Sequence, residues 1–111
     1  MSRSAERFIE LLKDELRLIM ARELELPDDT LLTLTHITVS DTREHANVMV
    51  SVYPESKADE AIETAKKQIV FVQHSLNKRL KRYRVPKISF VLDKSAAHVQ
   101  KIEEILKKEV E

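Results

Sequence analysis

Apolar side chains recur every three or four residues near the start of the chain, which is the spacing of one buried stripe on a helix. This pattern predicts an amphipathic helix from Ser4 to about Leu24. The apolar positions are Phe8, Ile9, Leu12, Leu16, Ile19, Met20 and Leu24. We expect Pro27 and the two aspartates after it to end the helix, because proline restricts the preceding residue and has no backbone N–H.

Two segments after this helix have the character of strands. Residues 32–40 are rich in Thr, Ile, Leu and Val, and residues 46–53 alternate apolar side chains with others. The polar segment Asp41–His45 between them is only five residues long. Such a short connection favours an antiparallel hairpin, and Pro54 is expected to close the second strand.

Helical spacing returns from Ala58 to about Arg82. The apolar positions are Ala58, Ala61, Ile62, Ala65, Ile69, Val72, Leu76 and Leu80. The run Ile69-Val70-Phe71-Val72 alone would favour a strand, because β-branched side chains lose freedom in a helix. The longer pattern favours a helix, and it is compatible with one long helix or with two abutting ones.

A third strand is predicted for Lys87–Leu92, directly after the helix-breaking pair Val85-Pro86. A final helix then follows, with Asp93 or Ser95 as its cap. The residues predicted to form its buried stripe are Val99, Ile102 and Leu106. The order of elements predicts an α+β fold, in which a three-stranded sheet is covered by helices on one face.

Composition limits the class of protein. The 111 residues, with 42% hydrophobic and 34% charged side chains, fit one domain spanning 1–111. Neither a signal peptide nor a membrane span is recognisable, so we expect a cytoplasmic protein that does not bind membranes. The chain contains no Gly, which argues against glycine-rich phosphate-binding loops, and no Cys, which excludes disulfides and thiolate sites.

One basic cluster stands out from a chain whose formal net charge is zero. Six basic residues occupy ten consecutive positions with no acidic residue among them: Lys78, Arg79, Lys81, Arg82, Arg84 and Lys87. Such a cluster can neutralise phosphates, and Tyr83 within it offers a ring on which a base could stack. The alternative is that the long predicted helix begins with acidic residues and ends with basic ones, and that this arrangement only complements the helix dipole.

Catalytic and metal-binding patterns are lacking. The four histidines, His36, His45, His74 and His98, show no metal-ligand spacing, and no Gly-x-Ser-x-Gly motif can be formed. His36 lies among threonines on a predicted strand, where a hydrogen-bonded side chain is the ordinary explanation. We therefore expect no enzyme activity, cofactor, metal or small-molecule substrate.

Several ordered segments carry a resemblance to a known family. They are Arg22-Glu23-Leu24 before Pro27, then Ile37-Thr38-Val39-Ser40-Asp41, then Ala46–Val52, and finally Val85-Pro86-Lys87-Ile88-Ser89-Phe90-Val91-Leu92-Asp93-Lys94-Ser95. Together, over about residues 5–106, they resemble the ribosome-binding factor A family. The resemblance implies a type II KH-like fold, with a second helix that continues or splits before the third strand.

The resemblance also implies a function. Members of this family bind the immature small (30S) ribosomal subunit and assist maturation of the 5′ end of 16S rRNA without catalysis. The six basic residues would then contact rRNA phosphates, Tyr83 would stack, and the protein would act as a monomer. The alternative is a KH-like protein-interaction module without RNA binding, which docks through a strand edge or the final helix. A small hydrolase is a third reading that no sequence feature recommends.

The chain departs from the family pattern at two junctions. The family joins its two central helices through Ala-x-Gly, where this chain has Gln68-Ile69-Val70. After the first helix the family has Lys-Asp-Pro-Arg, where this chain has Glu25-Leu26-Pro27-Asp28. Without a Gly-x-x-Gly loop the domain cannot clamp four nucleotides, so we expect weak affinity for short isolated RNA.

Overall fold

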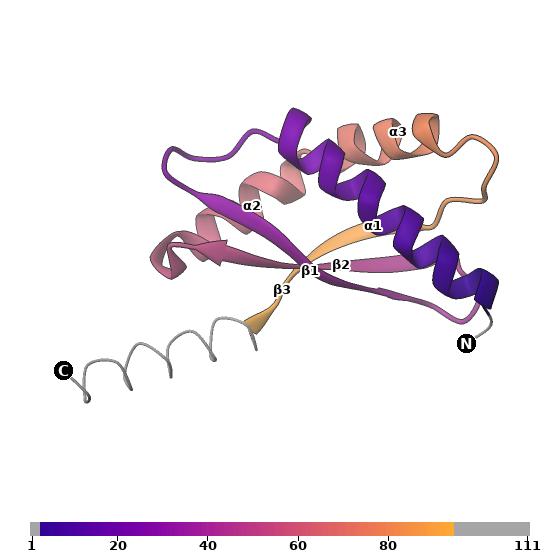
Figure 1. Ribbon diagram of the computed structural model, residues 1–111. Coiled ribbons are helices and arrows are strands. Elements are labelled where there is room, and N and C mark those ends of the chain that lie inside the picture. The colour runs from indigo at the N-terminus through magenta and orange to yellow at the C-terminus, as the bar shows by residue number, and fades with distance from the viewer. Residues whose placement is uncertain (1–2, 95–111) are drawn as a thin grey trace.

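The computed structural model describes residues 3–94 and gives the predicted order of elements over that range (Figure 1). The elements are α1 (Arg3–Glu23), β1 (Leu31–Val39), β2 (His45–Tyr53), the 3-10 helix η1 (Glu55–Lys57), α2 (Ala58–Lys67), α3 (Ile69–Arg79) and β3 (Lys87–Leu92). The predicted final helix, with Ser95, Val99, Ile102 and Leu106, lies outside the described residues.

The three strands form one mixed sheet in the order β1-β2-β3. β1 and β2 pair antiparallel from Leu31 opposite Tyr53 to Val39 opposite Ala46, which confirms the predicted hairpin. β3 pairs with β2 in parallel, starting at Lys87 opposite His45. The helical segment between the two strands provides the long crossover that a parallel pair needs.

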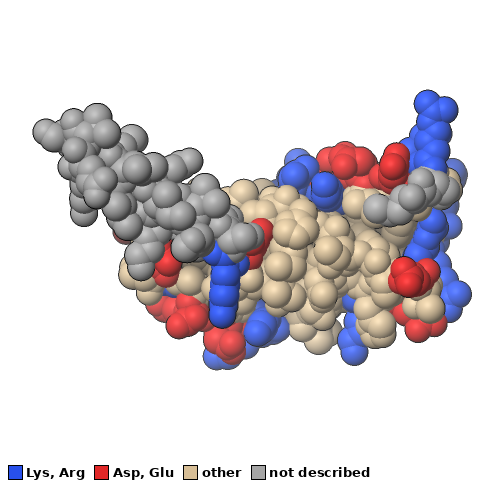
Figure 2. All heavy atoms as spheres, turned by 90° about the horizontal axis from the view of Figure 1, so that it is seen from below, with Lys and Arg blue, Asp and Glu red and all other residues tan. Residues whose placement is uncertain are grey.

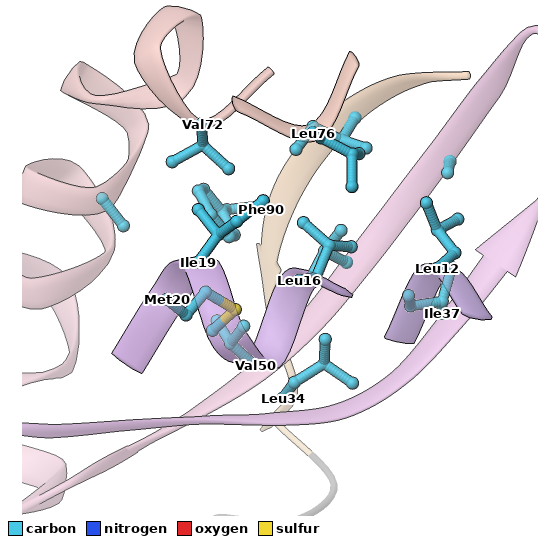
Figure 3. Close-up of a cluster of buried hydrophobic side chains, with 14 of the residues drawn as sticks. Leu12, Leu16, Ile19, Met20, Leu34, Ile37, Val50, Val72, Leu76 and Phe90 are labelled. Carbon is cyan, nitrogen blue, oxygen red and sulfur yellow. The ribbon is translucent and has the colours of Figure 1, made fainter. Parts of the chain in front are cut away.

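The three α-helices within residues 3–94 cover one face of the sheet, as predicted for the helices (Figure 1). The core between the layers takes side chains from every long element, as Figure 3 shows for Leu12 and Leu16 of α1, Val50 of β2 and Leu76 of α3. These four side chains are fully shielded from water. Burial of one such aliphatic side chain contributes roughly 1.5–3 kcal/mol, so this layer holds the helices on the sheet.

The long helical segment is split into α2 and α3 at Gln68, whose backbone is non-helical with φ −99° and ψ 9°. The Gln68 side chain bonds the backbone of Glu25 twice. Its Oε1 accepts from the Glu25 N–H at 3.0 Å, and its Nε2 donates to the Glu25 carbonyl at 2.6 Å. Nε2 also lies 3.1 Å from the Thr64 carbonyl. The break therefore forms without glycine, and it is joined to the loop that follows α1.

The run at residues 69–72 is helical, as the longer pattern predicted. Val72 is fully buried on the core side of α3, whereas Val70 is 79% exposed. Burial of the core-facing side of α3 thus outweighs the local preference of the β-branched residues for a strand. The helix ends at Arg79, about three residues earlier than the pattern suggested, and residues 80–82 form turns instead.

Replacing Gln68 tests whether its side chain stabilises the α2–α3 break. We expect Gln68→Ala to lower the free energy of unfolding by about 1 kcal/mol, since hydrogen bonds to Glu25 are lost at a partly hydrated site. Urea denaturation followed by circular dichroism measures this change. Lys67→Ala, at the exposed neighbouring position, is the control. Equal stability of the two variants would contradict this role.

Candidate nucleic-acid interface

The seven residues singled out from the sequence lie together along one connection. Lys78 and Arg79 end α3, the next four lie in the loop of residues 80–86, and Lys87 begins β3. All seven side chains are exposed. Leu80 and Pro86 anchor the two ends of the loop, because both are buried. The charged residues between these anchors are therefore presented to solvent from fixed positions.

Carboxylates neutralise little of this charge. The Nε atom of Arg79 donates to Oε2 of Glu15 on α1, and the two side chains form an ion pair. The other five basic residues make no ion pair with any residue in the range 3–94. Lys78, Lys81, Arg82, Arg84 and Lys87 thus remain available to an anionic partner. We define these five as the basic loop.

Tyr83 has a partner within the protein. Its ring centroid lies 5.7 Å from that of Phe8 on α1, with the two planes tilted by 39°. Such a tilted pair is a favourable arrangement of aromatic quadrupoles. Because 49% of Tyr83 remains exposed, the ring could still offer area to a base. The contact with Phe8 holds the basic loop against the first turns of α1, whereas stacking of a base on Tyr83 stays a prediction.

The hairpin between β1 and β2 reaches the same end of the molecule (Figure 1). Its Arg43 places the guanidinium carbon 6.0 Å from the centroid of the Phe8 ring. The backbone N–H of Lys87 donates to the carbonyl of Glu44 at 2.8 Å. Figure 2 shows Lys and Arg side chains gathered at this end, on the right in both views, with a few Asp and Glu side chains among them.

Sequence reasoning did not single out Arg43. It is the one Lys or Arg in the segment Asp41–His45, and its acidic neighbours in the chain mean that no run of basic residues marks it. Its proximity to the basic loop depends on a shared contact with Phe8, which no local pattern encodes. The backbone of Arg43 takes the left-handed conformation, with φ 61°. Arginine is uncommon in this conformation, so the residue type gives little indication of it.

His36 is hydrogen-bonded within the fold, as expected for a histidine among strand threonines. Its Nδ1 is hydrogen-bonded with Oγ1 of Thr35 at 3.4 Å and lies 3.5 Å from Oδ2 of Asp93. The Thr35 hydroxyl also donates to that carboxylate at 2.7 Å. Residues 3–94 contain no group of three or more His, Cys, Asp or Glu side chains placed to hold a metal ion. None of the described helices combines the length and hydrophobicity needed to cross a membrane.

Sequence comparison finds one family over nearly the whole chain. The family model described as ribosome-binding factor A matches residues 4–106. The protein named ribosome-binding factor A from Halothermothrix orenii is 37% identical over 105 residues, which cover 94% of this chain and 86% of that one. A protein of the same name from Caldanaerobacter subterraneus is 32% identical over 105 residues, or 93% and 86% of the two chains.

Solved structures share the fold. The crystal structure of ribosome-binding factor A from Thermus thermophilus superposes with a TM-score of 0.62 at 22% identity, covering 78% of this chain and 92% of that one. A homology model of the Thermus thermophilus protein, fitted into the cryo-EM map of a 30S complex with that factor, gives a TM-score of 0.52 at 18% identity. That comparison covers 86% of this chain and 97% of the other.

Variants at Tyr83 test its contact with Phe8. We expect Tyr83→Ala to lower the free energy of unfolding by about 1 kcal/mol, because the aromatic pair is lost. Tyr83→Phe is the matched control and should keep wild-type stability, since it retains the ring. Thermal and urea unfolding measure both variants. If Tyr83→Ala were as stable as Tyr83→Phe, the ring contact would contribute nothing to the fold.

Proposed function

Because the chain belongs to the ribosome-binding factor A family, we propose that it binds the small ribosomal subunit through rRNA contacts made by the basic loop. The observation that carries this proposal is the set of five exposed cations without an ion-pair partner among the described residues. Cations in this state can replace the counterions of a phosphate backbone, and the release of those ions drives association.

The shape of the domain favours a folded RNA partner over a short single strand. Leu80 and Pro86 anchor the two ends of the loop backbone in the core, so the backbone from which its charges project is held against the domain. Phosphate contacts of this kind set position and orientation but carry little sequence information. Specificity then comes from the arrangement of phosphates on the folded subunit. The absence of glycine also leaves no Gly-x-x-Gly loop to clamp an isolated strand.

We further propose that binding assists maturation of the 5′ end of 16S rRNA and that the protein acts without catalysing a reaction itself. The family membership supports this role. In this proposal the protein works in the cytoplasm as a monomer. The sheet and helices serve as the scaffold, and the partner is the immature 30S subunit rather than a small molecule.

The alternative is a KH-like module that docks a protein instead of RNA. Val70 and Phe71 on α3 favour it, because these large apolar side chains are 79% and 52% exposed. The start of the β3 edge is less suited to docking a strand. There Gln73 already pairs with the backbone, accepting from Ile88 N–H at 2.9 Å and donating to the Pro86 carbonyl at 3.1 Å. Salt dependence separates the two classes of partner.

Cosedimentation with purified small and large subunits over a salt series tests subunit binding. If the five cations of the basic loop each contact a phosphate, affinity for the small subunit should fall about 100- to 500-fold between about 50 and 200 mM salt, the larger value applying to double-helical RNA. The double variant Arg82→Glu/Arg84→Glu should weaken binding by about 100-fold or more at low salt, because two attractive contacts become repulsive.

The control is Arg22→Glu/Lys67→Glu, which changes the net charge by the same amount at exposed positions outside the loop. This control should bind within about threefold of wild type. A flat salt response, or equal loss in both double variants, would contradict phosphate binding by the basic loop. A flat response together with loss of binding in Val70→Ser/Phe71→Ser would instead support protein docking.

The role in rRNA maturation is tested in cells that lack this protein. We expect them to accumulate 16S rRNA precursors with an extended 5′ end, which primer extension measures. The wild-type protein and the Arg22→Glu/Lys67→Glu control should restore processing, whereas Arg82→Glu/Arg84→Glu should not. Full processing in the absence of the protein would refute this role while leaving subunit binding intact.

A further inference from the structure

The tip of the β1–β2 hairpin is held in one conformation by its own hydrogen bonds. The Arg43 N–H donates to the Ser40 carbonyl at 2.9 Å, and the His45 N–H donates to Ser40 Oγ at 3.1 Å. The Ser40 N–H closes the turn by donating to the His45 carbonyl at 2.9 Å. Arg43 itself takes the left-handed conformation, with φ 61°. Its side chain therefore leaves the tip from a defined backbone.

The Arg43 guanidinium remains free to bind an anion. It lies over the Phe8 ring, and a cation–π contact uses none of its five N–H donors. Asp41 and Glu44 flank it in the turn, yet no carboxylate of the described residues lies within ion-pair distance of it. The side chain is exposed. The aromatic contact restricts its rotamers, which reduces the entropy lost on binding.

We propose that the β1–β2 hairpin is a second RNA-contacting element and that Arg43 binds a backbone phosphate of the same rRNA that the basic loop contacts. This inference rests on the proposed function and extends it to a residue in a different part of the chain. Arginine suits this task because its planar fork of donors matches the geometry of phosphate oxygens.

Phe8 places the two elements side by side. Its ring centroid lies 6.0 Å from the Arg43 guanidinium carbon and 5.7 Å from the Tyr83 ring centroid. These distances bring the Arg43 guanidinium within about 12 Å of the Tyr83 ring. Arg82 and Arg84 are the residues on either side of Tyr83 in the chain. A nucleic-acid strand in a helix advances only about 3.4 Å of axis per phosphate, so a few nucleotides can span both elements. Phe8 and Tyr83 are the positioning residues in this arrangement.

Backbone contacts also fix the hairpin relative to the basic loop. The Lys87 N–H donates to the Glu44 carbonyl at 2.8 Å, directly beside Arg43 in the chain. The register continues with Lys87 opposite His45 and Ile88 opposite Ala46. The last cation of the basic loop and the hairpin tip are therefore joined through backbone pairing in the sheet.

The slope of log affinity for the purified small subunit against log salt tests this inference. Arg43→Ala should weaken binding about three- to tenfold at low salt and reduce the slope by about 1, because one phosphate contact is lost. Arg43→Lys keeps the charge and should keep the slope. The alanine variant should fold normally, since alanine at the positive φ of this position costs about what arginine does.

A double-mutant cycle tests the positioning role of Phe8. In a Phe8→Leu background, which keeps an apolar side chain in the core, Arg43→Ala should reduce affinity by a smaller factor than in wild type. A merely structural role for Phe8 would leave that factor unchanged. Thermal unfolding of each variant verifies that the domain is folded under the binding conditions.

Arg22→Ala is the matched control, because Arg22 is exposed and lies at the other end of α1 from Phe8. It should bind like wild type. If Arg43→Ala also bound like wild type while the Arg82/Arg84 variant lost affinity, the hairpin contact would be refuted and the proposed function would stand. If neither variant lost affinity, the proposed function itself would fail.

Discussion

Burial of the apolar face of α1 against the sheet and α3 is the interaction on which the rest of the structure depends. Leu12 and Leu16 are shielded completely, and they hold the helix across the strands. This placement brings Phe8, one turn before Leu12, to the end where the hairpin and the α3–β3 loop meet. Glu15, on the same helix, reaches Arg79. The packing of one helix thus arranges the surroundings of the candidate interface.

The surplus of positive charge lies on a loop, whereas the sheet and helices form the scaffold that holds this loop. The chain is neutral as a whole, so long-range attraction to RNA is modest, and a local surplus of cations must provide the contact. That surplus lies on a loop whose ends, Leu80 and Pro86, are buried. A rigid scaffold that presents charged loops is a common way to build a binding surface, because the loops add function without disturbing the core.

At the α2–α3 break, where the family has a glycine, this chain forms the break by a different physical means, through the side chain of Gln68. A glycine permits a kink because it lacks a side chain. Gln68 stabilises one through its side chain, which satisfies both backbone groups of Glu25, 43 residues away. The sequence left open whether the helix was continuous or split. A glutamine has no local preference for a break, so only its distant hydrogen-bond partner explains the geometry.

The sequence by itself determined the order of the described strands and helices and the basic cluster, but not whether the long helix is split. Periodic burial along α1, alternation in Lys87–Leu92 and the proline before it are local signals, because each reflects which side of a short segment faces the core. Tertiary structure alone decided that Glu15 pairs with Arg79 and that Arg43 lies near the basic loop. These contacts join residues far apart in the chain, so they depend on how the layers pack and leave no periodic trace in the sequence.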